Sequence, residues 1–228
     1  MAQWQTPLNI RQEAARKLLD PNARPGPFVT ISRQYGCSGL TLGLLLADIL
    51  NEHTPPGRGW RVYGREILEQ LARESNLATE LVEDLSIHKP KLLVDFFRAV
   101  SSRRIPSGIE VRNRVTAIVR GLAFEGFAII VGQGSSGATA DMDNGLSIRL
   151  EAPLEWRIAE IARREGCSLT QARAAISKME KERQYIRQIY AARFPREPAF
   201  DLVYDDSRFS LAQIAQHVVQ LMRLKRMA

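Results

Sequence analysis

The sequence predicts an α/β fold, a single parallel sheet of five strands with helices packed on both faces. One observation on the sequence and one rule of chain connection predict it. Five short runs rich in apolar and β-branched residues alternate with segments of helical periodicity along the 228 residues. Strands that alternate with helices pair in parallel, because each helix returns the chain to the same edge of the sheet. The predicted strands are residues 28–31, 60–63, 127–131, 146–150 and 201–204.

Composition narrows the class of protein. Hydrophobic residues make up 45% of the chain, which is enough for a full core. No apolar run reaches membrane-spanning length, and polar Asn9 and Arg11 interrupt any signal-peptide core. Two cysteines are too few for a disulfide framework, so a cytoplasmic location is expected. A net charge of +7 and a pI of about 9.8 favour anionic partners, either nucleotides or nucleic acid.

Residues 1–27 read as an N-terminal appendage, and residues 28–228 form the main domain. Residues 10–19 carry one apolar helical stripe, and the proline-rich stretch 21–27 follows as a linker. A helix that packs on the main domain without a function of its own is the favoured interpretation.

The strand at 28–31 is followed by a turn that contains Gly36 and Gly39, with the small residues Cys37 and Ser38 between them. A helix comes next, because five apolar residues recur on one face: Leu42, Leu45, Leu46, Ile49 and Leu50. Strand, glycine-rich turn and helix in that order are typical of a phosphate cradle. The alternative is an ordinary turn whose glycines serve only packing.

The turn departs from the Walker pattern GxxxxGK[ST]. Laid over residues 33–40, Ser38 replaces the second glycine, Gly39 the lysine and Leu40 the hydroxyl residue. Arg33 and Thr41 are the nearby residues that can supply the missing charge and hydroxyl.

Cys37 has two interpretations. A helix N-terminus lowers the pKa of a thiol, which predicts a reactive cysteine. The favoured alternative is a small residue that merely fits the turn.

Further candidate residues follow two other strands. Arg65 lies just after the strand at 60–63, where ligands of parallel sheets bind, although an exposed surface arginine is an equal alternative. The helical insert that follows, about 64–107, is placed to cover a substrate. The strand at 127–131 runs into a second glycine-rich turn, Gly132–Gly137. Two such turns at carboxyl ends of strands are expected to flank one crevice.

The helix after Ser168 begins with a capping box formed by Ser168 and Gln171. One stripe of that helix then contains Leu169, Ala172, Ile176, Met179, Arg183, Ile186 and Tyr190. An inward arginine needs an anionic partner, because burying it alone is costly. For Arg183 that partner is either an internal carboxylate, such as Asp201 or Asp205, or a phosphate.

Four segments of the chain match the motifs of one known protein family. TISRQYGCSG at 30–39 is similar to its TISRQ-(F/Y)-GSGG signature, and IIVGQG at 129–134 to its IVGRG turn. EAPLEWRI at 151–158 resembles APLExRI, and FDLVYDDSRFSL at 200–211 resembles YDLxxxTSxLS. These segments occur in the order and spacing of the cytidylate kinase-like family, which the chain resembles from residue 28 to about 222.

The resemblance implies a nucleoside monophosphate kinase with a P-loop NTPase-type fold, a degenerate Walker turn, an NMP-side insert at about 64–107 and a helical lid at about 166–196. ATP would bind the first turn with Mg²⁺, and a CMP-like nucleoside monophosphate (NMP) the second. Arg33, Arg183 and Arg187 would stabilise the transferred phosphoryl group. The acceptor would contact Arg65, Gln133 and Gly134. The donor site would comprise Gly36, Cys37, Ser38, Gly39, Leu40, Thr41 and Arg157, with Thr41 as the Mg²⁺ ligand.

Three departures from the family weigh against turnover. Ser38 replaces a glycine, Gln133 an arginine, and Glu182 the first of two basic lid residues, whereas Arg183 retains the second. The competing hypothesis is a kinase fold that has lost catalysis and acts as a nucleotide sensor or nucleic-acid-binding module. Nucleic acid is less favoured, because the basic residues are spread over several helices without a dense run. The acceptor nucleotide and the oligomeric state stay open.

Overall fold

The computed structural model describes residues 25–52, 54, 59–66, 68, 108–132, 134–193 and 199–227. Most of the predicted appendage and of the predicted insert lies outside the described residues. So does Gln133. Within the helices, the side chains of 108–114, 186–187 and 189–193, and therefore that of Arg187, are also outside the description.

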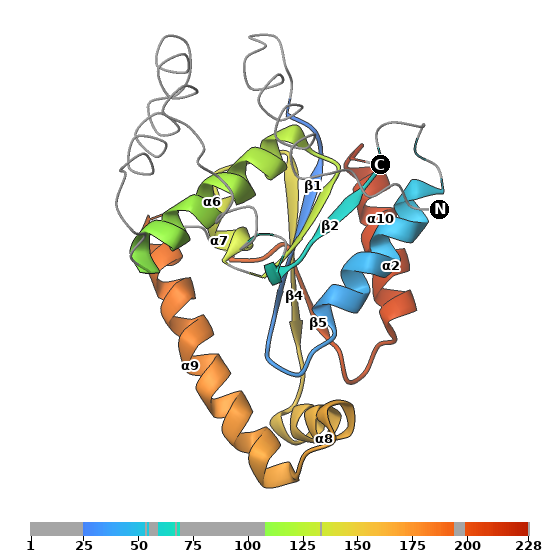
Figure 1. Ribbon diagram of the computed structural model, residues 1–228. Coiled ribbons are helices and arrows are strands. Elements are labelled where there is room, and N and C mark those ends of the chain that lie inside the picture. The colour runs from blue at the N-terminus through green and yellow to red at the C-terminus, as the bar shows by residue number, and fades with distance from the viewer. Residues whose placement is uncertain are drawn as a thin grey trace.

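All five predicted strands form one parallel sheet in the order β2-β3-β1-β4-β5 (Figure 1). Their bounds are β1 (Phe28–Arg33), β2 (Arg61–Tyr63), β3 (Ala128–Val131), β4 (Gly145–Glu151) and β5 (Leu202–Asp205). The α/β prediction is therefore confirmed. β1 occupies the centre of the sheet, because β3 and β4 pair with it on either side.

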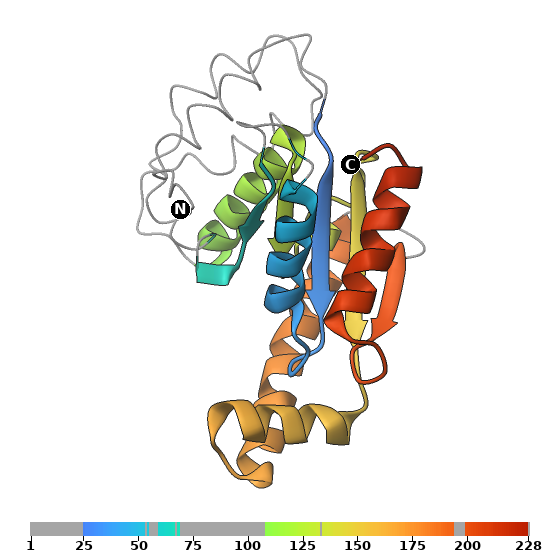
Figure 2. The ribbon, with the colours of Figure 1, turned by 90° about the vertical axis from the view of Figure 1, so that its right-hand side faces the viewer.

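Helices cover both faces of the sheet. Figure 2 looks onto the face that carries α2 (Gly39–Asn51) and α10 (Leu211–Leu224). The opposite face carries α6 (Gly108–Glu125) and the short α7 (Ser135–Ala138). No helix among the described residues is long and apolar enough to cross a membrane.

The core lies in two layers, because side chains of β1 alternate between the faces of the sheet. Val29 and Ile31 pack with α2 and α10, whereas Phe28 packs with α6. The first layer also contains Leu42, Leu46, Leu50, Ile214 and Val218. The second contains Val115, Val119, Leu122 and Ile130.

The remaining helices, α8 (Leu154–Glu165) and α9 (Leu169–Arg193), project from the carboxyl end of the sheet (Figure 1). They share a small core of Ile158, Ile161, Ala172 and Ile176. The capping box at the start of α9 is confirmed, since Ser168 and Gln171 exchange hydrogen bonds of 2.9 and 3.3 Å. Leu169 was predicted on the inward stripe, and that prediction is wrong. Its side chain is 62% exposed, because packing against α8 begins one turn later, at Ala172.

Candidate functional site

The two glycine-rich turns follow neighbouring strands. β1 and β3 are adjacent, yet the chain leaves β1 toward β2 on one side and leaves β3 toward β4 on the other. Ligands of open parallel sheets bind at such a reversal, outside the carboxyl ends of the strands. The N–H group of Gly132 donates to the carbonyl of Ile31 at 2.9 Å, which ties the second turn to β1, the strand that precedes the first turn.

The first turn presents backbone donors at the start of α2. The first helical hydrogen bond runs from the N–H of Leu42 to the carbonyl of Ser38 (3.0 Å). Helix geometry therefore leaves the N–H groups of Gly39, Leu40 and Thr41 without an intrahelical acceptor. These donors and the helix dipole favour an anion at that end of the helix.

Gly36 allows this turn to form. Its φ of +104° lies in the region that favours glycine, and an added Cβ would come within 2.9 Å of the Cβ of Arg157. Both the backbone conformation and the close approach of α8 therefore require a residue without a side chain.

Arg33 bridges the two turns. A Cβ on Gly39 would lie 3.1 Å from Arg33 Cδ, and a Cβ on Gly132 only 1.7 Å from Arg33 Nη1. The side chain thus crosses the start of α2 and places its guanidinium against the second turn. Burial, together with the positive charges of Arg183 and Arg65, lowers the pKa of Arg33 to about 10. The site therefore concentrates positive charge, and a bound anion would reduce the repulsion between these arginines.

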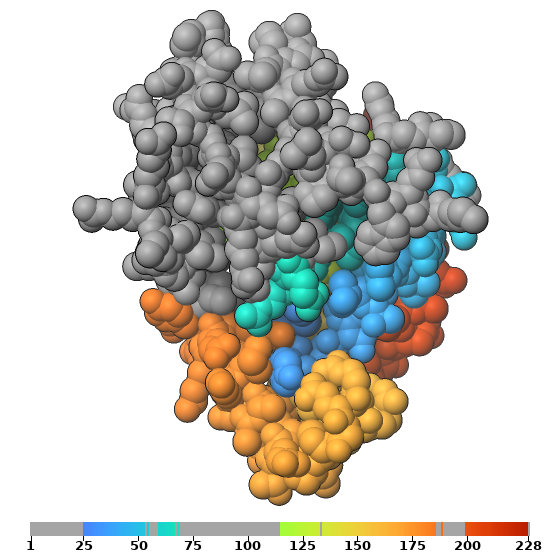
Figure 3. Space-filling model, in the orientation of Figure 1, coloured from blue at the N-terminus to red at the C-terminus, as the bar shows by residue number. Residues whose placement is uncertain are grey.

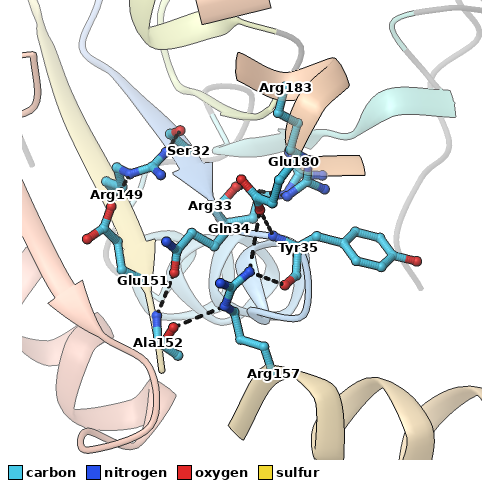
Figure 4. Close-up of polar contacts among 10 residues, drawn as sticks. All are labelled: Ser32, Arg33, Gln34, Tyr35, Arg149, Glu151, Ala152, Arg157, Glu180 and Arg183. Carbon is cyan, nitrogen blue, oxygen red and sulfur yellow. Dashed lines mark hydrogen bonds and ion pairs between the residues drawn. The ribbon is translucent and has the colours of Figure 1, made fainter. Parts of the chain in front are cut away.

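Arg183 reaches this cluster from α9 (Figure 4). Its Nη1 donates to the carbonyl of Arg33 at 2.8 Å, and its guanidinium lies 5.3 Å from the centre of the Tyr35 ring. The half-buried side chain therefore turns toward the main domain, as its register in the helix predicts. Arg65 is exposed at the carboxyl end of β2. Arg187 belongs to the next turn of α9.

Two carboxylates, which the sequence reasoning missed, also bind the first turn. The N–H of Tyr35 donates to Glu180 Oε1 at 2.6 Å, and the N–H of Ser38 donates to Asp206 Oδ2 at 2.8 Å. Burial raises the pKa of Asp206, although the hydrogen bond from Ser38 opposes that rise. Its position directly after β5, at the same edge of the sheet, was the signal that could have revealed it.

Arg157 holds the first turn from the side of α8. Its Nε donates to the carbonyl of Ala152 at 3.0 Å and its Nη1 to the carbonyl of Tyr35 at 3.2 Å, and it pairs with Glu180 at 3.5 Å. The side chain is only 7% exposed. These contacts fix the backbone around Gly36, and Figure 4 shows Arg157 between the turn and α8.

Arg149 is an arginine near the site that the sequence reasoning missed. From β4 it donates to Glu151 Oε1 at 2.6 Å and to the hydroxyl of Ser32 at 3.0 Å, and its guanidinium lies over the ring of Phe200. It therefore links the end of β1 to its neighbouring strand beside the first turn.

The surroundings of Cys37 raise the pKa of its thiol, whereas a reactive cysteine needs a lowered pKa. Burial raises the pKa of its thiol to about 12, and the carboxylate of Asp206 adds to that rise. These effects outweigh the helix terminus, so the interpretation of Cys37 as a small residue that fits the turn is the one that the structure favours.

A divalent cation would find few protein ligands here. No group of three or more His, Cys, Asp or Glu side chains among the described residues is placed to hold a metal ion. Mg²⁺ that arrives with a nucleotide needs few, because phosphate oxygens and water complete its shell. Thr41 fits that requirement, since it is exposed on the first turn of α2. Leu40, which precedes it, offers no hydroxyl.

The site is open to solvent on one side. In the space-filling view, blue atoms from the first turn and the start of α2 appear at the surface between the orange of α9 and α8 (Figure 3).

Comparisons with known proteins agree with this arrangement. The sequence profile of the cytidylate kinase-like family matches residues 28–208. A cytidylate kinase from Methanopyrus kandleri is 30% identical over 159 residues, which are 68% of this chain and 82% of that protein. A crystal structure of an uncharacterized protein from Eubacterium ventriosum superimposes with a TM-score of 0.63 at 17% identity and covers 86% of this chain and 98% of the other. That structural likeness supports the fold alone.

Proposed function

Since this chain belongs to the cytidylate kinase-like family, we propose that it transfers the γ-phosphoryl group of ATP to a nucleoside monophosphate, with CMP as the first acceptor to test. The observation that supports the proposal best is the convergence of Arg33, Arg183 and Arg65. Burial chiefly, and then the charges of Arg183 and Arg65, lower the pKa of Arg33 to about 10. Phosphoryl transfer requires positioned cations more than covalent chemistry from the protein.

The donor phosphates would bind the N–H groups of Ser38, Gly39, Leu40 and Thr41, with Gly36 and Cys37 shaping the turn. Gly39 occupies the Walker lysine position and brings no charge. Arg33 supplies it instead, because its side chain crosses Gly39 and ends beside Gly132. A guanidinium in that place can contact phosphates on either turn.

Arg183 and Arg187 would stabilise the charge on the transferred group as α8 and α9 close. Arg183 already contacts the backbone of Arg33 at 2.8 Å, so a small movement of its guanidinium would reach a phosphate on the first turn. Stabilising the equatorial oxygens in this way lowers the barrier of the reaction.

The acceptor phosphate would bind between Arg65 and the second turn, where we assign Gln133 and Gly134. Gly134 is the N-cap of α7 with φ +72°, a conformation that suits glycine. Mg²⁺ bound to the nucleotide would shield the phosphate charge, with Thr41 as its protein ligand. Arg157 acts as a positioning residue on the donor side, because it fixes the turn through the carbonyl of Tyr35.

The test is a phosphotransfer assay with ATP, Mg²⁺ and each common nucleoside monophosphate, measured on the purified protein. Transfer to one acceptor, with CMP preferred, is the expected result. Binding of ATP without transfer to any acceptor would favour the alternative, a nucleotide sensor. Binding to nucleic acid would favour the nucleic-acid module if its affinity falls steeply with salt concentration and does not depend on the base sequence.

A further inference from the structure

Asp206 occupies a donor of the proposed phosphate site. Its Oδ2 accepts a 2.8 Å hydrogen bond from the N–H of Ser38, although the two residues are 168 positions apart in sequence. Ser38 is the N-cap of α2, so this N–H lies beside those of Gly39, Leu40 and Thr41. The carboxylate therefore stands where the oxygen of a ligand phosphate would be bound.

The surroundings of Asp206 make this contact important to it. Its side chain is buried, with 8% exposed, and this burial raises its pKa. The negative charges of Glu160 and Asp205 raise the pKa further. A hydrogen bond from the thiol of Cys37 and the one from Ser38 favour its charged form. A buried carboxylate needs such donors, because an uncompensated charge is costly.

We propose that Asp206 is an internal competitor for the phosphate site, which must leave the N–H of Ser38 before a ligand phosphate can bind there. The inference rests on the proposed binding of nucleotide phosphates to this turn. One N–H cannot serve two anions fully, and two anions side by side repel each other. Ligands of high negative charge are therefore disfavoured more than ligands whose charge a cation has partly neutralised.

This competition predicts a specific gain of affinity. Asp206→Asn keeps the size of the side chain and removes its charge. Two unit charges about 4 Å apart repel by about 1 kcal/mol in water and by more near a protein. Metal-free tripolyphosphate should therefore bind Asp206→Asn at least about fivefold more tightly than it binds the wild type. Mg²⁺-bound ATP should gain less.

Asp205→Asn provides a matched control. Asp205 is the last residue of β5 and directly precedes Asp206, but its carboxylate accepts hydrogen bonds from the N–H and hydroxyl of Ser207, at 2.9 and 2.6 Å. The control removes the same formal charge without removing an anion from the first turn. Affinities for tripolyphosphate without metal, and for ATP with Mg²⁺, are measured by isothermal titration calorimetry on full-length proteins whose folding is checked by circular dichroism.

A gain confined to Asp206→Asn supports the inference. Unchanged or weaker tripolyphosphate binding in that variant would overturn it, as would equal gains in both variants, which would indicate a general charge effect. Asp206→Ser repeats the test with a smaller side chain if Asp206→Asn does not fold. A wild type and folded variants that all fail to bind ATP and tripolyphosphate would instead overturn the proposed function itself.

Discussion

Gly132→Ala tests the placement of Arg33 between the two turns. Gly132 has φ +79°, and an added Cβ would lie 1.7 Å from Arg33 Nη1. The backbone conformation alone costs a non-glycine residue about 1–2 kcal/mol. The guanidinium is the far end of a flexible side chain and can shift, so its displacement adds about 1 kcal/mol, the low end of overpacking costs. We therefore expect Gly132→Ala to lower the free energy of unfolding by about 2–3 kcal/mol.

Gly166→Ala is the matched control, because Gly166 has φ +63° and no atom within 4 Å of an added Cβ. It should show the backbone cost of about 1–2 kcal/mol alone. A double-mutant cycle isolates the contact with Arg33. In an Arg33→Ala background, the cost of Gly132→Ala should fall to that of Gly166→Ala. Urea unfolding at equilibrium gives all four values, and an equal cost of Gly132→Ala with and without Arg33 would refute the placement.

Two other predictions concern Cys37 and Asp141. Cys37 should react with iodoacetamide at neutral pH much more slowly than Cys167, because Cys37 is buried and its thiol pKa is raised to about 12. Peptide mass spectrometry of the alkylated protein gives the two reaction rates. A faster reaction of Cys37 would mean that the helix terminus dominates. Asp141 accepts two hydrogen bonds from Arg120, at 2.6 and 3.0 Å, and these lower its pKa below 3.8 although burial opposes them. The stabilisation from this pair is present above the unfolded pKa and is lost as the pH falls through the lower folded value. Asp141→Asn should therefore lower the free energy of unfolding by about 1–3 kcal/mol at pH 7. This is less than for a fully buried pair, because the carboxylate is 37% exposed. At pH 3 the loss should be clearly smaller. Urea midpoints at both values check this, and a penalty that does not depend on pH would contradict it.

The strands and both glycine-rich turns could be predicted because their signals are local. Each strand is a contiguous apolar run, and each turn follows directly from one. The inward register of Arg183 was also predictable, since it continues the stripe of Ala172 and Ile176. That register did not reveal the partner, which is the carbonyl of Arg33 and the ring of Tyr35.

What escaped the sequence depends on contacts between distant segments. Asp206 and Glu180 bind residues of the first turn that lie 168 and 145 positions away in the sequence, and no spacing rule predicts such contacts. One of the two interpretations of Cys37 predicted a lowered thiol pKa. That interpretation used only the local helix dipole and took no account of burial or of Asp206, which raise the pKa. Leu169 was misplaced, because periodicity does not show where packing between two helices begins.

The most direct test of the proposed chemistry is the turnover number of Arg183→Ala, compared with that of Arg173→Ala. Both arginines lie on α9, but Arg173 is exposed and pairs with the exposed side chain of Glu155 on α8, not with the first turn. If Arg183 stabilises the transferred phosphoryl group, its loss should lower kcat by about 10³-fold, whereas Arg173→Ala should leave kcat near the wild-type value. The free energy of unfolding of Arg183→Ala should fall by about 2–3 kcal/mol, as expected for the loss of a hydrogen bond from a charged group and of the contact with the Tyr35 ring. Equal kcat values for the two variants, or a loss of activity that matches a loss of folded protein, would contradict a catalytic Arg183.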